Sequence, residues 1–522
     1  MTSGTPRDDT QAEVIAFLRD PKSHGADTRH VEVIETHGAL VFLAGETALK
    51  IKRAVRLAYL DFSTLAKREA VCRQEIAINK PNAPDIYRDV VAITREADGG
   101  LRIEGGGAPV EWAVRMARFD QAALFSAIAD RTGIDDELAA ALAEMMLGAH
   151  DVAERRSLDD AAGHMGRIIG NVDRSFETAA TEVDGLAELH CRFLALAEAQ
   201  LGRLGDLLRK RAGAGLVRRC HGDAHLGNIV LWNGRPQLFD AIEFDEGLAT
   251  IDVLYDLAFL LMDLDRRGKR RAAHVVLDRY LAGTGRMLDL EGLATLPLFL
   301  GLRAGIRAMV AFDRARVQST AQKPGTVQHG LETLARAVDY LSPPPPRLIA
   351  VGGFSGTGKT TLARRLAPLL PPAPGALHLR SDVMRKQLAG RRELERLSSD
   401  AYTQQASDEV YRQLGGRARL ALEAGHSVVV DAVFANGAQR AAVEQIATDL
   451  GVAFDGVWLE AASDVLKARV QSRTGDASDA TPDVVARQVA TGAGTISWHR
   501  VAAGGRAEAV TAAAAKALSA AD

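Results

Sequence analysis

The sequence predicts an α+β region followed by an α/β region, and three observations support this division. Residues 31–118 contain short alternating apolar runs typical of strands, whereas 134–208 carry alanine and leucine at helical spacing. Four consecutive prolines at 343–346 exclude helix and sheet and favour a stiff spacer. An apolar strand, a glycine-rich loop and a helix follow over 347–366, which is typical of a doubly wound parallel sheet.

These patterns set the expected domain boundaries. We expect an N-terminal region with a β-rich lobe at 1–118 and a helical lobe at 119–341. A linker at 342–347 then leads into a second domain at 348–522. A chain of 522 residues is too long for one ordinary core, and the sequence shows no internal repeat. The two halves are therefore predicted to be different folds.

Composition narrows the function classes. The net charge of −3 is nearly balanced, so we expect no nucleic-acid partner. Cys72, Cys191 and Cys220 have no paired spacing, which favours a reducing compartment over a disulfide or zinc framework. The polar N-terminal segment and the short apolar runs predict a cytoplasmic protein without a membrane partner. No oligomeric state is predicted.

The glycine-rich loop has a recognisable phosphate-binding pattern. Residues 353–360 fit G-x-x-x-x-G-K-[ST], between a strand and a helix as the pattern requires. Its glycines let backbone N–H groups point at phosphate oxygens. We expect Lys359 to reach the β and γ phosphates and Thr360 to hold Mg²⁺. The predicted ATP-binding residues of this loop are Gly353, Ser355, Gly356, Thr357, Gly358, Lys359, Thr360 and Thr361.

A second phosphate-transfer pattern lies in the first half. His221 begins the sequence H-G-D-x-x-x-x-N, and two apolar runs joined by Asn-Gly predict a hairpin directly after it. This places Asp223 on a loop, Asn228 where the first strand starts and Asp240 where the second ends. Kinase chemistry needs a carboxylate for the substrate hydroxyl, and an amide plus a second carboxylate for Mg²⁺. The alternative is a polar loop capped by its own side chains.

Residues 30–330 resemble the aminoglycoside phosphotransferase and choline kinase superfamily through these motifs. The resemblance implies a two-lobed, protein-kinase-like fold. It implies that Asp223 is the catalytic base and that Asn228 and Asp240 are metal ligands. It also suggests Glu243 as an additional ligand.

The post-loop helix of that superfamily corresponds to a segment that contains Asp256. We expect Asp256 to be structural, either capping its helix or pairing with a base in the catalytic loop.

A nucleotide-anchoring lysine is expected on the third strand. Lys50 fits an A-x-K pattern, and Lys52 lies on the same strand face two residues later. We favour Lys50, with Lys52 as the alternative. If neither lysine has a function, the two residues are simply an exposed basic strand edge. The acidic partner on the next helix is expected to be Glu75, with Glu69 as the alternative.

A carboxylate at the end of a buried strand is predicted in the second half. Residues 425–431 contain three consecutive valines, typical of a parallel strand covered on both faces, and end in Asp431. The carboxyl end of such a strand faces the ligand crevice, so we expect Asp431 to hold Mg²⁺ through water. A helix cap is the alternative.

Residues 378–386 resemble the D-x-x-R element of small P-loop kinases, among them gluconate kinase, polynucleotide kinase, zeta toxin and chloramphenicol phosphotransferase types. The resemblance implies that Asp382 activates the acceptor hydroxyl and that Arg385 steadies the substrate or phosphate. The alternative is that Ser381 or Asp382 caps the following helix.

Two arginines are expected near a lid. Arg469 and Arg473 lie four residues apart and share a helix face, followed by a loop at 474–479. They resemble the lid arginines that stabilise charge on a transferring phosphoryl group. A solvated basic face is the alternative.

Together these motifs predict a kinase that uses ATP and Mg²⁺ and transfers phosphate to small-molecule hydroxyls, such as sugars or aminoglycosides. The combination of domains resembles bacterial proteins described as bifunctional aminoglycoside phosphotransferase and ATP-binding proteins. Two alternatives remain. One domain regulates the other, or the second half is a toxin-like kinase held in check by the first.

Overall fold

The computed structural model describes residues 9–36, 38–57, 60–317, 322–472 and 475–519. Arg473, one of the two predicted lid arginines, lies outside these residues.

The chain folds into two compact units. The first comprises Met1–Asp159 and Ala212–Asp263, and the second comprises Asp160–Arg211 and Leu264–Asp522. The first unit contains an antiparallel sheet with the H-G-D loop, and the second contains a helical bundle with a parallel sheet. The α+β and α/β classes predicted from the sequence are confirmed.

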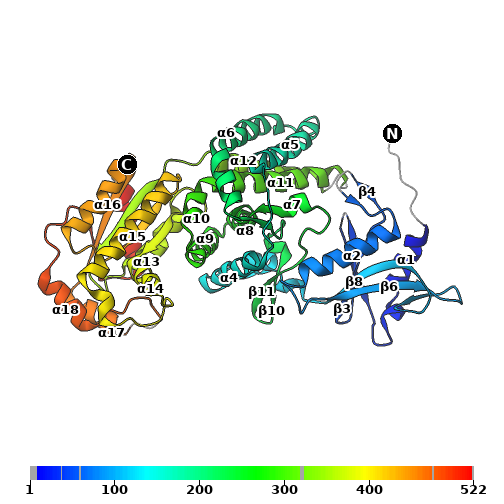
Figure 1. The fold of residues 1–522 in the computed structure, drawn as a ribbon, viewed down its shortest axis with the longest axis horizontal. Helices are drawn as coiled ribbons and strands as arrows, with labels where there is room; N and C mark the ends of the chain where they lie inside the picture. The colour runs from blue at the N-terminus through cyan, green and yellow to red at the C-terminus, as the bar shows by residue number, and fades with distance from the viewer. Residues whose placement is uncertain (1–8, 37, 58–59, 318–321, 473–474, 520–522) are drawn as a thin grey trace. The chain divides into compact units, whose positions relative to one another are not determined.

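The sheet of the first unit has six strands in the order β1-β2-β3-β8-β6-β7, each antiparallel to its neighbours. Figure 1 shows this sheet in blue tones together with α2. The elements are α1 (Asp9–Arg19), η1 (Pro21–His24), β1 (Val31–Glu35), β2 (Ala39–Ala44), β3 (Thr47–Lys52), β4 (Arg56–Leu57), β5 (Leu60–Asp61), α2 (Leu65–Asn79), β6 (Tyr87–Arg95), β7 (Leu101–Ile103) and β8 (Ala108–Ala117).

The two faces of this sheet are covered by different helices. Leu49 and Ile51 of β3 share a core with Val14 of α1. Ala48 of β3 shares the opposite core with Cys72 of α2. Because side chains alternate along a strand, Lys50 and Lys52 of β3 lie on the α2 face with Ala48. The two-residue repeat of the strand therefore places both lysine side chains on the face that α2 covers.

The H-G-D loop lies between short strands of the first unit. The predicted hairpin is present as β10 and β11, which pair from Ile229↔Leu238 to Trp232↔Arg235. Asn233 and Gly234 at its turn both have positive φ, 50° and 76°. The elements of this region are η2 (Gln121–Ala123), α3 (Phe125–Arg131), α4 (Asp136–Val152), β9 (Val217–Arg219), η3 (Leu226–Asn228), β10 (Ile229–Trp232), β11 (Arg235–Leu238), α7 (Glu246–Ala249), β12 (Thr250–Asp252) and α8 (Val253–Arg266).

The helical bundle of the second unit precedes the prolines. Its elements are α5 (Ala161–Ala180), α6 (Leu186–Gly213), α9 (Arg270–Thr284), α10 (Met287–Glu291), η4 (Gly292–Thr295), α11 (Leu296–Val317) and α12 (Lys323–Leu341). The stretch Met287–Arg316 is long and apolar enough to cross a membrane by length and composition, but 67% of its most apolar window is buried. This burial is typical of a core helix in a folded domain.

The second sheet has five parallel strands in the order β14-β15-β13-β16-β17, with the first strand of the region at its centre. Its strands are β13 (Arg347–Gly353), β14 (Leu377–Arg380), β15 (Val428–Asp431), β16 (Ala453–Glu460) and β17 (His499–Ala502). Its helices are α13 (Lys359–Leu366), η5 (Ala367–Leu369), α14 (Ser381–Leu388), η6 (Ser399–Tyr402), α15 (Gln404–Glu423), α16 (Gly437–Leu450), α17 (Ser463–Gln471), α18 (Pro482–Thr491) and α19 (Ala507–Ser519).

The core of the parallel sheet joins its central strands to α13 and α19. Val351, Val429 and Val457 are buried against Leu362 of α13 and Ala514 of α19. From β13 the chain crosses to β14 on one side of the sheet, whereas from β16 it continues to β17 on the other side, so the direction of the connections changes between β13 and β16. Ligands bind beyond the carboxyl ends of the strands at such a point. The loop after β13 occupies this position.

Candidate active sites

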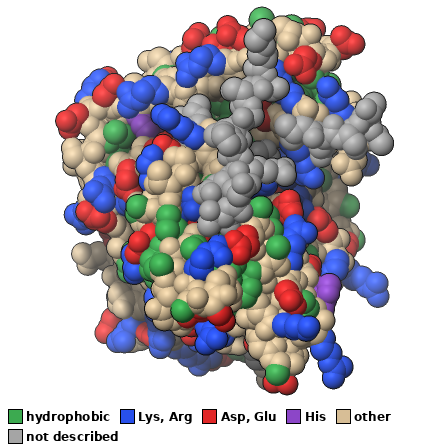
Figure 2. Space-filling view, turned by 90° about the vertical axis from the view of Figure 1, so that its right-hand side faces the viewer, with side chains coloured by type: hydrophobic (Ala, Val, Ile, Leu, Met, Phe, Trp, Pro, Cys, Tyr) green, Lys and Arg blue, Asp and Glu red, His purple; other side chains and the backbone are tan. Residues whose placement is uncertain are grey.

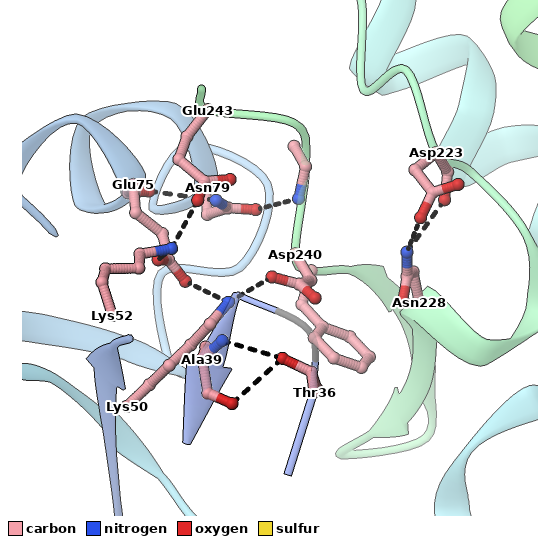
Figure 3. Close-up of polar contacts among 12 residues, drawn as sticks. Thr36, Ala39, Lys50, Lys52, Glu75, Asn79, Asp223, Asn228, Asp240 and Glu243 are labelled. Carbon is pink, nitrogen blue, oxygen red and sulfur yellow. Dashed lines mark hydrogen bonds and ion pairs between the residues drawn. The ribbon is translucent and has the colours of Figure 1, made fainter. Parts of the chain in front are cut away.

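Two lysines of β3 share one buried glutamate of α2 (Figure 3). Lys50 Nζ lies 2.9 Å from Glu75 Oε1, and Lys52 Nζ lies 2.6 Å from Glu75 Oε2. Each lysine also holds one acidic residue of the segment after β11. Lys50 Nζ lies 2.5 Å from Asp240 Oδ1, and Lys52 pairs with Glu243. The Glu75 side chain is fully buried, so each of its oxygens depends on a lysine for compensation.

This cluster is charged at neutral pH. Burial by itself lowers the pKa of Lys50, but the Asp240 and Glu75 carboxylates outweigh it and raise the pKa well above its ordinary value. Burial raises the pKa of Glu75, but Lys50 and Lys52 outweigh it, so the net shift is downward. The pKa of Asp240 is lowered in the same way, burial being overcome by Lys50. The cluster is therefore a network of ion pairs.

The structure separates Glu75 from Glu69 as the acidic partner, but it does not separate Lys50 from Lys52. Both Lys50 and Lys52 face Glu75, whereas Glu69 lies on the surface and pairs with Arg73 at 2.9 Å. Glu243, suggested as an additional metal ligand, is paired with Lys52. Sequence reasoning missed the pairing of Lys52 with Glu243. The only available signal was the spacing of two residues on β3.

The backbone at Asp240 is held in an uncommon conformation. Its φ is +62°, a region that residues with side chains seldom adopt. Tyr87 Oη accepts a hydrogen bond from the Asp240 amide at 3.0 Å, and Asn79 Oδ1 accepts one from the Ala241 amide at 2.8 Å. Residues of β6 and α2 thus fix the backbone that carries this carboxylate. Strain of this kind concentrates at functional sites.

Asp223 and Asn228 meet on the H-G-D loop (Figure 3). Asn228 Nδ2 donates hydrogen bonds to Asp223 Oδ2 at 2.8 Å and to the Asp223 carbonyl at 3.0 Å. The Asp223 side chain is 37% exposed, which leaves its carboxylate within reach of a ligand. Its charge also opposes ionisation of Asp240, so the two carboxylates belong to one electrostatic site.

The loop that carries Asp223 is anchored by Asp256 of α8. Asp256 accepts hydrogen bonds from the amides of His221, at 3.3 Å, and Gly222, at 2.9 Å. Its Oδ2 also lies 3.1 Å from His150 Nε2 of α4. The sequence suggested a helix cap or a partner for a basic residue. Asp256 instead holds the backbone of the H-G-D loop, with His150 as a side-chain partner.

His221 links the same loop to the segment before Asp240. Its Nε2 donates to the Phe239 carbonyl at 3.0 Å, and its Nδ1 accepts from the Asp223 amide at 3.3 Å. Burial lowers the pKa of His221, so the ring is neutral and one nitrogen is free to accept. The neutral tautomer required by these two bonds fixes Asp223 relative to Phe239.

The phosphate-binding loop lies in the predicted position between β13 and α13. Gly356 has φ +86°, and a Cβ there would lie 2.6 Å from the Leu466 carbonyl of α17. Only glycine fits this close approach. Lys359 Nζ donates to the Phe354 carbonyl at 3.2 Å, so its ammonium group lies over the loop.

A side chain of α18 also reaches the phosphate-binding loop. The amide of Ser355 donates to Gln488 Oε1 of α18 at 2.9 Å. Sequence reasoning missed Gln488.

Thr360 and Asp431 meet at the carboxyl end of the sheet. Thr360 Oγ1 donates to Asp431 Oδ2 at 2.5 Å. Burial by itself raises the pKa of Asp431, but His378, Lys359 and Arg380 outweigh it and hold the pKa at about 2. A hydroxyl and an ionised carboxylate are hard oxygen donors of the kind Mg²⁺ prefers. The chemistry of this pair therefore fits the predicted metal site.

Asp382 lies in the first turn of α14 near this pair. Burial raises the pKa of Asp382, with Lys359 opposing the shift. Arg380 is the N-cap residue of α14, so neither Ser381 nor Asp382 occupies the capping position. A carboxyl with a raised pKa is suited to proton transfer.

Arg380 is a residue that sequence reasoning missed. Its side chain is 8% exposed and lies 2.9 Å from Glu393 and 2.9 Å from Asp476. Its Nε lies 3.8 Å from Asp431 Oδ2. The sequence signal that could have found it is a charged residue at the end of a strand in which every second residue is apolar.

The remaining predicted arginines contact protein groups. The guanidinium of Arg385 lies 4.9 Å from the ring centroid of Tyr402 and donates to the Ala401 carbonyl at 2.6 Å. Arg469 donates to the Ala503 carbonyl at 2.8 Å, and it lies 3.5 Å from the Gly356 carbonyl of the phosphate-binding loop. Arg469 is thus next to the loop, whereas Arg385 borders the segment before α15.

These arrangements combine an antiparallel sheet and an H-G-D loop in the first unit with a parallel sheet and a phosphate-binding loop in the second. The comparisons agree with the second part, because residues 348–493 match the family model described as AAA domain. An uncharacterized protein of Mycobacterium tuberculosis (strain ATCC 25618 / H37Rv) is 28% identical over 482 residues, covering 91% of this chain and 93% of that protein. The adenylyl-sulfate kinase of Myxococcus xanthus is 32% identical over 117 residues, covering 22% of this chain and 59% of that enzyme.

A choline/ethanolamine kinase family protein from Mesorhizobium loti is 15% identical, with a TM-score of 0.37, and covers 64% of this chain and 99% of that one.

Proposed function

We propose that the chain is an ATP- and Mg²⁺-dependent phosphotransferase with two sites, each of which transfers a phosphoryl group to a hydroxyl of a small molecule. The observation that carries the proposal is the contact of Lys50 with both Glu75 and Asp240, in the unit that also holds Asp223 and Asn228. Phosphoryl transfer needs a lysine, metal-binding oxygens and a hydroxyl-orienting carboxylate in one site. We propose that the domain at 1–341 carries one such site and that the domain at 348–522 carries the other.

In the first site, Asp223 is proposed to orient the acceptor hydroxyl and take its proton. Asn228 holds one Asp223 oxygen by a hydrogen bond, so the other is directed away from the amide. The amide oxygen of Asn228 and the carboxylate of Asp240 are the residues that would hold Mg²⁺, which neutralises phosphate charge when bound. Lys50 would contact the nucleotide phosphates.

In the second site, Asp382 is proposed to accept the hydroxyl proton, consistent with its raised pKa, which has burial as its main cause. Thr360 and Asp431 would hold Mg²⁺, and Lys359 would contact the transferring phosphate. Arg469 lies beside the loop, where a guanidinium can stabilise charge on phosphate oxygens. Arg385 is proposed to steady the acceptor.

The acceptor is proposed to be a small molecule such as a sugar or an aminoglycoside. The near-balanced net charge of −3 counts against a nucleic acid. The face of the molecule in Figure 2 shows basic and acidic side chains interspersed. Similarity to an adenylyl-sulfate kinase supports a small hydroxyl-bearing acceptor for the second site.

The test is phosphate transfer from ATP by the full-length protein to a panel of sugars, aminoglycosides and adenylyl sulfate. Asp223→Ala and Lys359→Ala are compared with wild type, and Arg209→Gln serves as a control on the exposed face of α6. Removing a base is expected to lower the rate by about 10²–10⁴. Each variant should lose transfer to a different acceptor. Unchanged transfer in both variants would contradict the proposal.

A further inference from the structure

The edge strand of the parallel sheet is covered by a helix that precedes the prolines. β14 pairs with β15 on one side only, through the register Leu377↔Val428 to Arg380↔Asp431. The other edge of such a strand presents unpaired backbone groups, which natural proteins cover or satisfy. Side chains of α9 meet this edge.

Three residues of α9 with a spacing of four lie along the chain from 368 to 378. Arg270 donates to the carbonyls of Pro368 and Leu370, at 2.8 and 3.1 Å. His274 Nε2 donates to the Ala376 carbonyl at 2.8 Å. Asp278 Oδ1 accepts from the His378 amide at 3.1 Å. Because residues four apart share a helix face, one face of α9 satisfies the backbone of this edge. A backbone carbonyl can only accept and a backbone amide can only donate, so the direction of each of these bonds is fixed.

The contact between α9 and this segment is close. Gly375 has φ +146°, and a Cβ at this position would lie 2.8 Å from His274 Cδ2 and 2.7 Å from the Ala367 carbonyl. His274 is 3% exposed. A larger residue at Gly375 would therefore push the helix away. The segment before β14 is shaped to receive α9.

Arg279 of α9 begins a row of charged groups that ends at Asp431, the carboxylate of the proposed Mg²⁺ site. Arg279 lies 2.6 Å from Glu393, and Glu393 lies 2.9 Å from Arg380. Arg380 in turn lies 3.8 Å from Asp431 Oδ2, the oxygen that accepts from Thr360. Burial opposes ionisation of Glu393, but Arg279 and Arg380 outweigh it and lower its pKa. Glu393 is thus an anion held between two arginines.

We propose that α9 is a built-in part of the phosphate-loop site, which it completes by sealing the β14 edge and by positioning Arg380 through Arg279 and Glu393. Glu393 restrains Arg380 at a distance from Asp431, so the Asp431 carboxylate stays available to Mg²⁺. Arg279 fixes Glu393 and is a positioning residue. This inference rests on the proposed function of the phosphate-loop site.

The seal is tested by hydrogen exchange on the full-length protein without nucleotide. Asp278→Ala removes the acceptor of the His378 amide, so exchange of this amide should become faster by about tenfold, the value of one lost hydrogen bond. Asp206→Ala is the control, because the Asp206 side chain is 95% exposed on α6. Exchange at His378 equal to that of wild type in Asp278→Ala would overturn the seal.

The charged row is tested by the Mg²⁺ concentration that half-activates ATP hydrolysis without an acceptor. The Asp223→Ala background removes turnover at the first site, and loss of the remaining hydrolysis in Lys359→Ala assigns it to the phosphate loop. Residual hydrolysis that persists in Lys359→Ala would contradict the proposed function itself, not the role of α9.

In this background, Glu393→Gln leaves Arg380 with Asp476 and Asp431 as its charged partners, so the guanidinium can move closer to Asp431 and Mg²⁺ must compete with it more strongly. We expect the half-activating concentration to rise by about three- to tenfold. Arg279→Gln should raise it by about two- to threefold, because the Arg279 pair is partly exposed. Arg279→Lys, which keeps the charge, should restore the wild-type value.

The matched control is Arg209→Gln, whose pair with Asp206 lies on the surface of α6. Melting temperatures of all variants are recorded, since a loss of folding alone would move the melting temperature without a specific Mg²⁺ shift. An unchanged Mg²⁺ requirement in Glu393→Gln overturns the proposal that Glu393 positions Arg380 relative to Asp431. A shift in Glu393→Gln with none in Arg279→Gln overturns the part assigned to α9.

Discussion

Lys50 and Asp240 are joined by an ion pair of 2.5 Å, while the same ammonium group lies 2.9 Å from Glu75. One lysine of β3 thus connects α2 to the segment that follows β11. Asp240 is proposed as a metal ligand, so Lys50 and Mg²⁺ would share or exchange this carboxylate when nucleotide binds. The Asp240 side chain is 43% exposed, which gives a ligand access to it.

Replacing Lys50 tests its role in nucleotide binding separately from its role in the stability of the fold. Lys50→Met should raise the KM for ATP of the first site and lower its kcat/KM by about 10²-fold, as expected for loss of a phosphate contact in a preorganised site. Glu75 retains Lys52, so stability should fall by less than the 3–5 kcal/mol typical of an unpaired buried charge. Steady-state kinetics and urea unfolding measure the two effects.

The control is Lys67→Met, because Lys67 pairs with Asp61 on the surface. An unchanged KM in Lys50→Met would exclude this lysine from the nucleotide site.

Acid should destabilise the protein through Glu75. The folded-state pKa of Glu75 is lowered from its ordinary 4.5 by Lys50 and Lys52, which overcome the opposing effect of burial. A depressed pKa contributes stability above the unfolded-state value, and this stability is lost as pH falls through the folded value. Below pH 4.5, wild type should lose stability more steeply than Glu75→Gln. Parallel slopes in urea unfolding at each pH would contradict this assignment.

Removing the hydroxyl of Thr360 should weaken metal binding at the phosphate loop. Thr360→Val keeps the shape but removes the donor to Asp431, so the Mg²⁺ requirement should rise by about tenfold, the equivalent of 1.4 kcal/mol. The melting temperature should change little. Thr178→Val on the exposed face of α5 is the control. The same Mg²⁺ requirement in both variants would argue against a metal role for Thr360.

Gln488 should compete with the nucleotide for the phosphate-binding loop. Its Oε1 accepts from the Ser355 amide at 2.9 Å, a donor that bound phosphate also needs. Gln488→Ala should tighten nucleotide binding at this loop by about two- to tenfold, because one hydrogen bond no longer has to be broken. Calorimetry measures this affinity as the component that Lys359→Ala removes. Weaker binding in Gln488→Ala would show that the side chain supports the nucleotide instead.

Loss of Asp256 should loosen the H-G-D loop, which carries the proposed base Asp223. Asp256→Ala removes the acceptor of the buried His221 and Gly222 amides, each of which costs about 1–3 kcal/mol when left unsatisfied. We expect the free energy of unfolding to fall by about 2–5 kcal/mol and kcat of the first site to fall with it. Stability equal to that of wild type would show that other groups hold the loop.

Local sequence patterns predicted the parts of the fold in which neighbours in sequence are neighbours in space. The Asn-Gly turn predicted the β10–β11 hairpin, which in turn fixes where Asn228 and Asp240 lie. The strand, glycine-rich loop and helix predicted the surroundings of Lys359 for the same reason. The alternation of β3 placed Lys50 and Lys52 on one face, although it did not rank them.

Partners that are distant in sequence were beyond this reasoning. Lys52 and Glu243 are separated by 191 residues, and Arg279 and Glu393 by 114. A charged residue on a strand or helix is usually solvated, so its sequence pattern carries no sign of a buried partner. Arg380 was missed for this reason, because its three acidic neighbours come from separate loops and strands.

The central claim is that the chain holds two independent nucleotide sites, and the stoichiometry of binding tests it most directly. Calorimetric titration of the full-length protein with a non-hydrolysable ATP analogue and Mg²⁺ should give two bound nucleotides per chain. Lys50→Met and Lys359→Ala should each reduce this to one and leave the other affinity unchanged. A single bound nucleotide in wild type, or loss of both sites in either variant, would contradict the account.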